Sequence, residues 1–269
     1  NRLAYRIFTE LGIVTPGVLD DIAKVMIIRK LSMDRSKELG VWKNQFSKTG
    51  FIDNIKSMIS ELYQYDISSE KIAAITQNEN ISTSLRHKLK DLNLMYESFT
   101  EYTKDKYIST EEIPDILVKH IKQSDLIKDS IILLDGFTGF TPIQYKLIEE
   151  LLKYSEDLIC TVTIGSGENI KEEGDESDLF GMSKVMHEKI LELCKRAAVQ
   201  NIEYTDLNNV SLLKDADFIK SKAIDHIEKY FLRYKPYTRI DSGGDISIVR
   251  AANIDEEVDM VVSRIMHLV

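Results

Sequence analysis

The clearest signal for the fold lies in residues 130–136, which read Ser-Ile-Ile-Leu-Leu-Asp-Gly. Four consecutive apolar residues that end in an acid and a glycine predict a short strand, buried on both faces as in a parallel sheet. Pro142 then stands at the first position of a predicted helix, and residues 158–164 predict the next strand because β-branched side chains dominate them. Strand, helix and strand in this order predict an α/β fold with parallel strands and a right-handed crossover.

The residues before this unit are expected to be helical almost throughout. Apolar side chains recur at helical spacing over residues 55–62, and Ser82 or Thr83 is placed to cap a longer helix that runs to Phe99. Ser109 and Glu112 have the spacing of a capping box, with Pro114 moving the helix start toward Ile113. We therefore expect a helical block or arm over residues 1–125, an α/β core over 126–245 with a short strand at 202–204, and the start of a second domain over 246–269, opened by a strand at 246–249.

Composition and charge limit the classes of protein that fit. The chain carries a net charge of −9 and 43% apolar residues, typical of a globular protein. No run approaches the ~20 apolar residues of a membrane span, and two cysteines cannot form a disulfide framework, which favours a reducing cytoplasm. The first 50 residues carry a net charge of +4, so a local basic face is compatible with the acidic charge of the whole protein. The chain also reads as a piece of a longer protein, because Asn1 already lies in a predicted helix.

A resemblance to a known family adds to this picture. Residues 130–152, and above all the string Asp-Gly-Phe-Thr-Gly-Phe-Thr-Pro within them, resemble the degenerate Walker B segment of the AddB family. These proteins are the B-type subunits of bacterial AddAB helicase–nucleases. The opening residues 1–6 and the terminal segment 246–257 resemble the same family, and the resemblance covers essentially the whole chain.

The resemblance implies an inactivated superfamily-one helicase, with a P-loop-helicase-like parallel sheet and a helical arm. It implies a heterodimer with an A-type helicase–nuclease subunit that processes double-stranded DNA ends in the bacterial cytoplasm. ATP, Mg²⁺ and a 4Fe–4S cluster are implied for the full complex, and no cofactor is expected within residues 1–269. No G-x-x-x-x-G-K-[S/T] loop occurs in the sequence, so the phosphate cradle is missing from it.

Asp135 marks the degenerate nucleotide and Mg²⁺ site. An acid at the carboxyl end of such a strand holds Mg²⁺ in P-loop hydrolases, and an aspartate that merely starts a loop is the alternative. Gly136 stands where active relatives carry the glutamate that activates water, so no side chain can act as a base there. Residues 165–168 also lack the pattern that senses the γ-phosphate in active relatives. Both departures predict a module without catalytic residues.

Several side chains are candidates for DNA contact. The resemblance matches Arg2 and Tyr5 to family positions associated with single-stranded DNA, and Phe137 and Phe140 flank Gly139 just after the predicted strand. An exposed aromatic ring can stack on a base, and an arginine can bind phosphate or a base edge. Packing of these rings into the core is the alternative.

The segment around Trp42, Lys43 and Lys48 combines basic and aromatic residues without an acid and is a second candidate for backbone binding. A helix connection with a buried tryptophan is the competing interpretation. Cys160 and Cys194 are expected to be core thiols rather than cluster ligands.

Three functions follow as hypotheses. The first is a DNA-scanning module that also scaffolds the motor partner. The second is a purely structural scaffold that docks the partner, and the third is a nucleotide-binding switch that uses Asp135. The first two differ in whether Arg2, Tyr5, Phe137 and Phe140 converge on one open groove.

Overall fold

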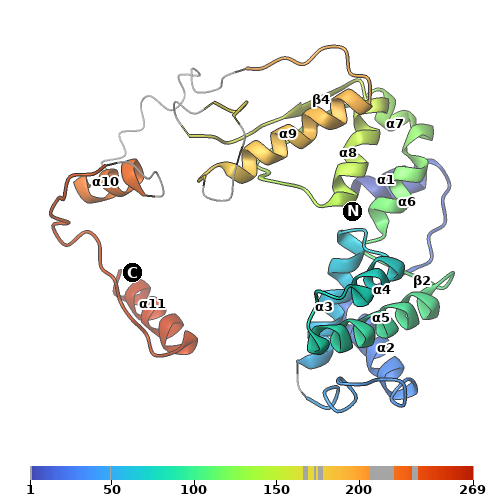
Figure 1. The fold of residues 1–269 in the computed structure, drawn as a ribbon. Helices are drawn as coiled ribbons and strands as arrows, with labels where there is room; N and C mark the ends of the chain where they lie inside the picture. Colours follow the sequence, from blue (N-terminus) through green and yellow to red (C-terminus); the bar gives the residue numbers. More distant parts are fainter. Residues whose placement is uncertain are drawn as a thin grey trace. The chain divides into compact units, whose positions relative to one another are not determined.

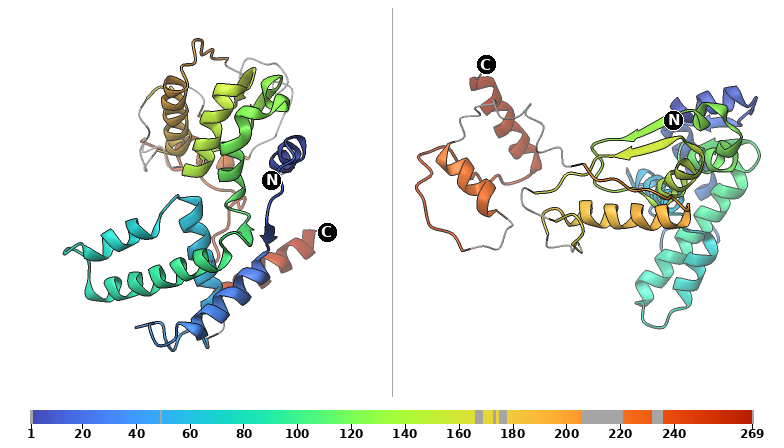
Figure 2. Two further views of the ribbon diagram at one scale, coloured as in Figure 1. Left: turned by 90° about the vertical axis from the view of Figure 1, so that its right-hand side faces the viewer. Right: turned by 90° about the horizontal axis from the view of Figure 1, so that it is seen from above.

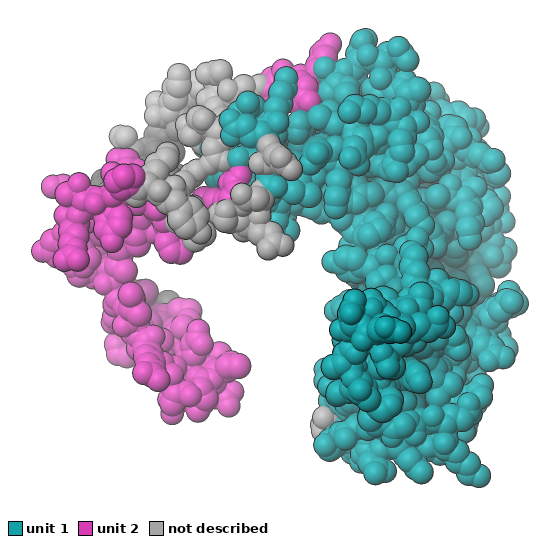
Figure 3. Space-filling model, viewed as in Figure 1, with its two compact units in different colours: residues 1–175, 180–202 teal, residues 176–179, 203–269 magenta. Residues whose placement is uncertain are grey.

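The structure is a computed structural model that describes residues 2–48, 50–165, 169–172, 174, 178–205, 221–231 and 236–268. The chain divides into two units, coloured separately in Figure 3. The first comprises residues 1–175 and 180–202, and the second residues 176–179 and 203–269.

Helices dominate both units, as Figure 1 shows. The first unit contains α1 (Arg2–Glu10), β1 (Gly17–Leu19), α2 (Asp21–Asp34), α3 (Phe51–Gln64), α4 (Ser69–Gln77), α5 (Thr83–Thr103), β2 (Tyr107–Ser109), α6 (Ile113–His120), the short helix η1 (Ile121–Gln123), α7 (Asp125–Lys128), β3 (Ile131–Leu134), α8 (Pro142–Tyr154), β4 (Asp157–Cys160) and α9 (Gly181–Arg196). The second contains α10 (Lys222–Tyr230) and α11 (Ile254–Leu268).

Helices α2 to α5 form the expected helical block, seen from two sides in Figure 2. Its core is built from apolar side chains such as Ile28, Ile55 and Phe99. Helix α5 begins as the sequence predicts, because the Ser82 hydroxyl accepts a hydrogen bond from the Leu85 amide at 3.2 Å. A cap of this kind satisfies one of the free amides at the start of a helix.

Helix α1 does not belong to that block, although the sequence analysis placed residues 1–125 together. Ala4, Ile7 and Phe8 pack in a second core with residues of α6 and α8, including Leu117 and Leu151. Periodicity shows that α1 has an apolar face, but it does not show which later helix covers that face. Helix α6 begins at Ile113, as the position of Pro114 predicts, and not directly after Ser109.

Two short parallel strands connect the helical block to the second core. Strand β1 pairs with β2 in the register Gly17↔Tyr107, Val18↔Ile108 and Leu19↔Ser109. The sequence analysis missed both strands, because three residues are too few to show an alternating pattern. The chain leaves for the helical block after β1 and returns into β2, so both crossings lie side by side.

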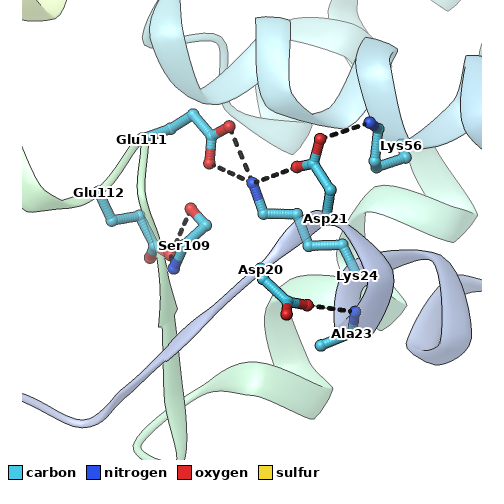
Figure 4. Close-up of polar contacts among 8 residues, drawn as sticks. All are labelled: Asp20, Asp21, Ala23, Lys24, Lys56, Ser109, Glu111 and Glu112. Carbon is cyan, nitrogen blue, oxygen red and sulfur yellow. Dashed lines mark hydrogen bonds and ion pairs between the residues drawn. The ribbon is translucent and has the colours of Figure 1, made fainter.

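A buried ion pair holds this joint together, as Figure 4 shows. The Lys24 ammonium of α2 donates to both carboxylate oxygens of Glu111, at 2.9 and 2.7 Å. Lys24 is 3% exposed, and Asp21 lies 3.9 Å from it while binding Lys56 at 2.9 Å. Beside this cluster, the backbone amide and hydroxyl of Ser109 donate to Glu112.

Strands β3 and β4 confirm the strand–helix–strand unit. They pair in parallel with Ile131 opposite Asp157 and Leu134 opposite Cys160, and α8 between them begins at Pro142 as predicted. The expectation that β3 is buried on both faces is wrong, because Ile131 and Leu133 are 61% and 63% exposed. The described part of the chain covers one face of this two-stranded sheet and leaves the other uncovered.

Two other predicted strands are absent from the described residues. Residues 202–204 and 246–249 have no regular secondary structure. Helix α11 does begin where the sequence predicts, with the Asn253 side chain accepting from the Glu256 amide at 2.9 Å. A β-branched run needs a neighbouring strand to complete its hydrogen bonds, and none of the described residues pairs with these two segments.

Candidate nucleic-acid interface

The carboxyl ends of β3 and β4 bring Asp135 and Thr161 together. The Thr161 hydroxyl donates to Asp135 Oδ1 at 2.6 Å and accepts a hydrogen bond from the Gly136 amide at 3.3 Å. The Thr161 amide continues the sheet by donating to the Leu134 carbonyl at 2.9 Å. Asp135 is therefore fixed at the edge of the sheet where ligands bind in open α/β folds.

Gly136 turns the chain away from β3. Its φ angle is +75°, a left-handed conformation that glycine adopts without strain. A Cβ atom at this position would meet nothing within 4 Å, so backbone conformation rather than space favours glycine here. The position next to Asp135 therefore offers no side chain that could act as an acid or base.

A pair of aromatic rings follows the turn at Gly136. Phe137 is exposed and lies against Phe140, with ring centroids 4.7 Å apart and planes tilted by 36°. Phe140 in turn contacts the edge of Tyr145 at 5.6 Å and packs on Met186 and Ile190 of α9. One ring of the pair is thus anchored in the core, and the other is presented to solvent on top of it.

Basic side chains that the sequence analysis missed lie beside Tyr145, the ring that contacts Phe140. The Lys189 ammonium is 5.4 Å from the centre of the Tyr145 ring, a cation–π distance. Lys189 also lines a groove of about 320 Å³ between α8 and α9, together with Lys146 and Arg196. Helical periodicity alone cannot reveal this cluster, because it depends on the packing of α8 against α9.

The basic charge of this groove is balanced by nearby acids. Lys146 pairs with Asp66 at 2.7 Å, and Arg196 pairs with Glu149 at 3.1 Å. Both pairs are partly exposed, and exposed ion pairs contribute little to stability. Lys189 makes no ion pair within the part of the chain that the structure describes. Of the three basic side chains in this groove, Lys189 is thus the one without an ion pair in the described structure, although Glu192 also lines the groove.

Arg2 and Tyr5 lie in different surroundings from the two phenylalanines. Both are exposed on α1, and Tyr5 lines an open depression of about 840 Å³ between α1 and α7. Glu10, Asp125 and Asp129 also line this depression. These three acids outnumber Arg6, which also lines the depression, and so disfavour a phosphate backbone there. Phe137 and Phe140 do not line it, so the four candidates lie as two pairs, one on α1 and one after β3.

The candidate loop around Trp42 divides into a buried and an exposed part. The Trp42 ring is buried in the helical core and meets the Phe51 ring edge-on at 5.5 Å. Its backbone amide donates to Asp91 at 2.8 Å, which holds the loop on α5. Lys43 and Lys48 stay exposed. The Trp42 ring is therefore buried, as the competing interpretation predicts. Of the three candidates in this loop, the two lysines are accessible.

The two thiols lie in the core, as expected. Cys160 is half-buried and Cys194 is buried in the cluster between α8 and α9, and burial raises the pKa of both. These two thiols do not fit a four-cysteine iron–sulfur site. In the described ranges no three His, Cys, Asp or Glu residues are placed to share a metal ion. Residues 166–168 belong to the segment that lacks the γ-phosphate-sensing pattern of active helicases. They lie outside the described part of the chain.

Comparisons with known proteins identify the family of the chain. The sequence model of the family described as "ADDB, N-terminal" matches residues 1–228. The chain belongs to the AddB family. It is 36% identical over 270 residues to the B-type subunit of the ATP-dependent helicase/deoxyribonuclease of Lachnoclostridium phytofermentans, which covers 99% of the chain. Proteins of the same description from Alkaliphilus metalliredigens and Clostridioides difficile are 28% and 29% identical and cover 100% and 98% of it.

The chain spans about a quarter of the length of these AddB relatives, since it aligns with 22–23% of each. No helix within the described ranges is both long and apolar enough to cross a membrane. The family is thus established for this segment, and the activity of a complete AddB protein is a matter for proposal.

Proposed function

We propose that residues 1–269 form a helicase-like module of the AddB subunit of a bacterial ATP-dependent helicase–deoxyribonuclease. In this proposal the module contacts single-stranded DNA, does not hydrolyse ATP itself, and supports an A-type partner subunit in a heterodimer that acts on double-stranded DNA ends. The ATP, Mg²⁺ and 4Fe–4S cluster of the complex are assigned to parts outside these residues.

The observation that carries the DNA-binding part is the aromatic pair after β3. Phe137 is exposed and rests on Phe140, and Phe140 contacts Tyr145, over which Lys189 lies. An exposed, supported ring can stack on a base whatever the base sequence, and a cation two rings further on can contact the phosphate backbone. The AddB relatives are described as helicase and deoxyribonuclease subunits, which supports DNA as the ligand.

The lack of hydrolysis is proposed from Gly136. Activation of water in phosphoryl transfer needs a positioned base or orienting side chain, and glycine provides none. Asp135 is also engaged by Thr161 at 2.6 Å. The nucleotide-switch alternative would therefore require residues outside this chain.

A scaffold without DNA reading is the second candidate function. It is favoured by the depression at Tyr5, where Glu10, Asp125 and Asp129 gather, and by the burial of Trp42. On that alternative the aromatic pair serves only to close the α8–α9 core.

The test replaces Phe137 in the full-length AddB protein, assembled with its partner. We expect Phe137→Ala to weaken binding of a single-stranded oligonucleotide by about 1–3 kcal/mol, the contribution of one stacked base. Lys189→Gln should flatten the salt dependence of binding, because one phosphate contact fewer releases fewer counterions. Tyr107→Ala serves as the matched control, since Tyr107 of β2 is 42% exposed, close to the 41% of Phe137, but does not line the α8–α9 groove.

Fluorescence anisotropy at several salt concentrations measures both effects. Equal affinities for wild type, Phe137→Ala and Lys189→Gln would leave the scaffold as the function. ATP turnover by residues 1–269 that disappears in Asp135→Ala would contradict the non-hydrolysing part and support the switch.

A further inference from the structure

A buried aspartate holds the loop between α2 and α3 on helix α5. Asp91 is 4% exposed, and its two carboxylate oxygens accept hydrogen bonds from the Gly40 amide at 2.9 Å and from the Trp42 amide at 2.8 Å. The buried Trp42 ring in turn meets Phe51, the first residue of α3, with ring centroids 5.5 Å apart. The loop therefore has a fixed position on both helices.

Basic side chains of this loop and of α5 lie around the aspartate. Lys43 and Lys48 belong to the loop, and His87 and Lys88 lie four and three residues before Asp91 on α5. This spacing places both α5 side chains on the helix face that holds the loop, one turn from its contact. All four side chains are exposed. We call Lys43, Lys48, His87 and Lys88 the basic surface.

Few acids are available to balance the basic surface. Residues 39–60 contain one acid, Asp53, and residues 80–96 contain one, Asp91. The carboxylate of Asp91 is buried against the loop amides. None of the three lysines makes an ion pair with a residue that the structure describes. The fold thus gathers cations from two separate segments, which creates a local positive potential on an acidic protein.

Exposed lysines limit what can cover this surface. If the rest of the polypeptide packed over it, each of Lys43, Lys48 and Lys88 would need a carboxylate, because lysine is almost never buried without a partner. A protein partner also fits poorly, because interfaces are depleted in lysine and are anchored mainly by aromatic residues and arginine. The rings in this loop, Trp42 and Phe46, pack into the core of the helical block.

We propose that the basic surface binds the phosphate backbone of duplex DNA. Lysine binds phosphate whatever the base sequence, and a loop that is already fixed loses little conformational freedom on binding. Single strands are bound through aromatic rings that stack on bases, and the basic surface offers none. The proposal rests on the proposed function in taking DNA as the ligand, and it adds a second contact to the aromatic pair.

The two contacts lie at opposite ends of α3. Lys146 of the α8–α9 groove pairs with Asp66, which follows the carboxyl end of α3. The loop that carries Lys43 and Lys48 leads into the amino end of the same helix. A helix of 14 residues is about 21 Å long. The groove and the basic surface are therefore separated by about the length of α3, and each can be changed without altering the other.

The experiment uses the full-length AddB protein that contains this chain, assembled with its partner subunit, and a blunt-ended DNA duplex. We expect the combined variant Lys43→Gln, Lys48→Gln and Lys88→Gln to bind the duplex more weakly. The slope of log affinity against log salt should become shallower by about 0.9 for each lysine that contacts a phosphate. A photo-crosslinking amino acid in place of Asn44, an exposed residue of the same loop, should join the protein to the duplex.

A matched variant controls for the change in net charge. Lys104→Gln, Lys122→Gln and Lys222→Gln together remove the same three charges from exposed positions outside the basic surface. We expect this variant to keep the salt dependence of wild type. An equally shallow slope in both combined variants would show that net charge alone is responsible, and would overturn the proposal. So would duplex binding that is unchanged in the variant of the basic surface.

Protein stability and subunit association distinguish other occupants. The three lysines are exposed, and glutamine is as good a helix former as lysine, so the thermal midpoint of the AddB protein should not change. A lower midpoint would show that carboxylates of the protein's own chain cover the surface. Weaker association with the partner subunit, at unchanged duplex binding, would show that an acidic face of the partner covers it. Either result would overturn the proposal.

The duplex contact and the single-strand contact fail in different ways. Phe137→Ala should weaken binding of a single-stranded oligonucleotide and leave the salt dependence of duplex binding unchanged. If Phe137→Ala has this effect and the lysine variant has none, the duplex contact is wrong and the proposed function stands. If only the lysine variant has an effect, the aromatic pair is not a DNA contact and the duplex contact stands.

Discussion

At the scale of single residues, Glu10 joins two segments that are far apart in the sequence. Its carboxylate accepts hydrogen bonds from the Ser124 hydroxyl and from the amides of Asp125 and Leu126. The bond from Ser124 contributes most to lowering the pKa of Glu10 below its usual 4.5, with smaller contributions from the two amides and opposition from burial. A lowered folded-state pKa stabilises above the unfolded value, and this contribution disappears as pH falls through the folded value.

We therefore predict that Glu10→Gln loosens α1 at neutral pH. Amide exchange of α1, corrected for intrinsic rates, should be faster in the variant at pH 7 and should converge with wild type below about pH 4.5. Glu61→Gln, a change at an exposed position on α3, is the control. A difference between wild type and Glu10→Gln that persists unchanged into acid would contradict the charge as the cause.

At the scale of elements, the Lys24–Glu111 ion pair holds the helical block to the β1–β2 joint. Burial alone would raise the pKa of Glu111, but the hydrogen bond and the charge of Lys24 outweigh it, and the pKa is lowered. Lys24→Met should lower the free energy of unfolding by about 3–5 kcal/mol, because it leaves the largely buried Glu111 carboxylate without its charged partner. Adding Glu111→Leu should restore most of that loss.

Urea unfolding at pH 7 and pH 5 measures these effects. Without Lys24 the pKa of Glu111 should rise, so the deficit of Lys24→Met should shrink as pH falls and the carboxyl takes up a proton. Lys56→Met is the control, since its partner Asp21 is largely exposed, and exposed pairs are worth at most about 1 kcal/mol. A double variant no more stable than Lys24→Met would contradict the pairing argument.

Elements were predictable where their signal is local. Ser82, Pro114 and Pro142 mark helix starts that the structure confirms, because caps and first-turn prolines act within one turn. The burial of β3 was not predictable. An apolar run shows that a strand favours a buried position, but it does not show which neighbouring elements cover its two faces. Ile131 is exposed for that reason.

At the scale of the whole molecule, the sequence indicates which candidate functional side chains are present but not which of them the fold brings together. Asp135 and Phe137 were recognisable from their place after a strand. Lys189 was not, because it meets Tyr145 only through the packing of α8 on α9. The grouping of α1 with α6 and α8 depends equally on contacts between distant segments.

The paired crossings at β1 and β2 make the helical block an exchangeable cassette. The chain departs after Leu19 and re-enters at Tyr107, and because β1 and β2 are parallel these two residues lie at opposite ends of the pair. A connection between parallel strands needs about a dozen residues or more. A glycine–serine bridge of at least about that length in place of residues 21–105 should therefore leave the core of α1, α6 and α8 able to fold, which circular dichroism and a cooperative thermal transition would show. Loss of that transition would mean that the core depends on its insert. If the transition persists, a different helical block could be inserted between β1 and β2 without changing the order of the remaining elements.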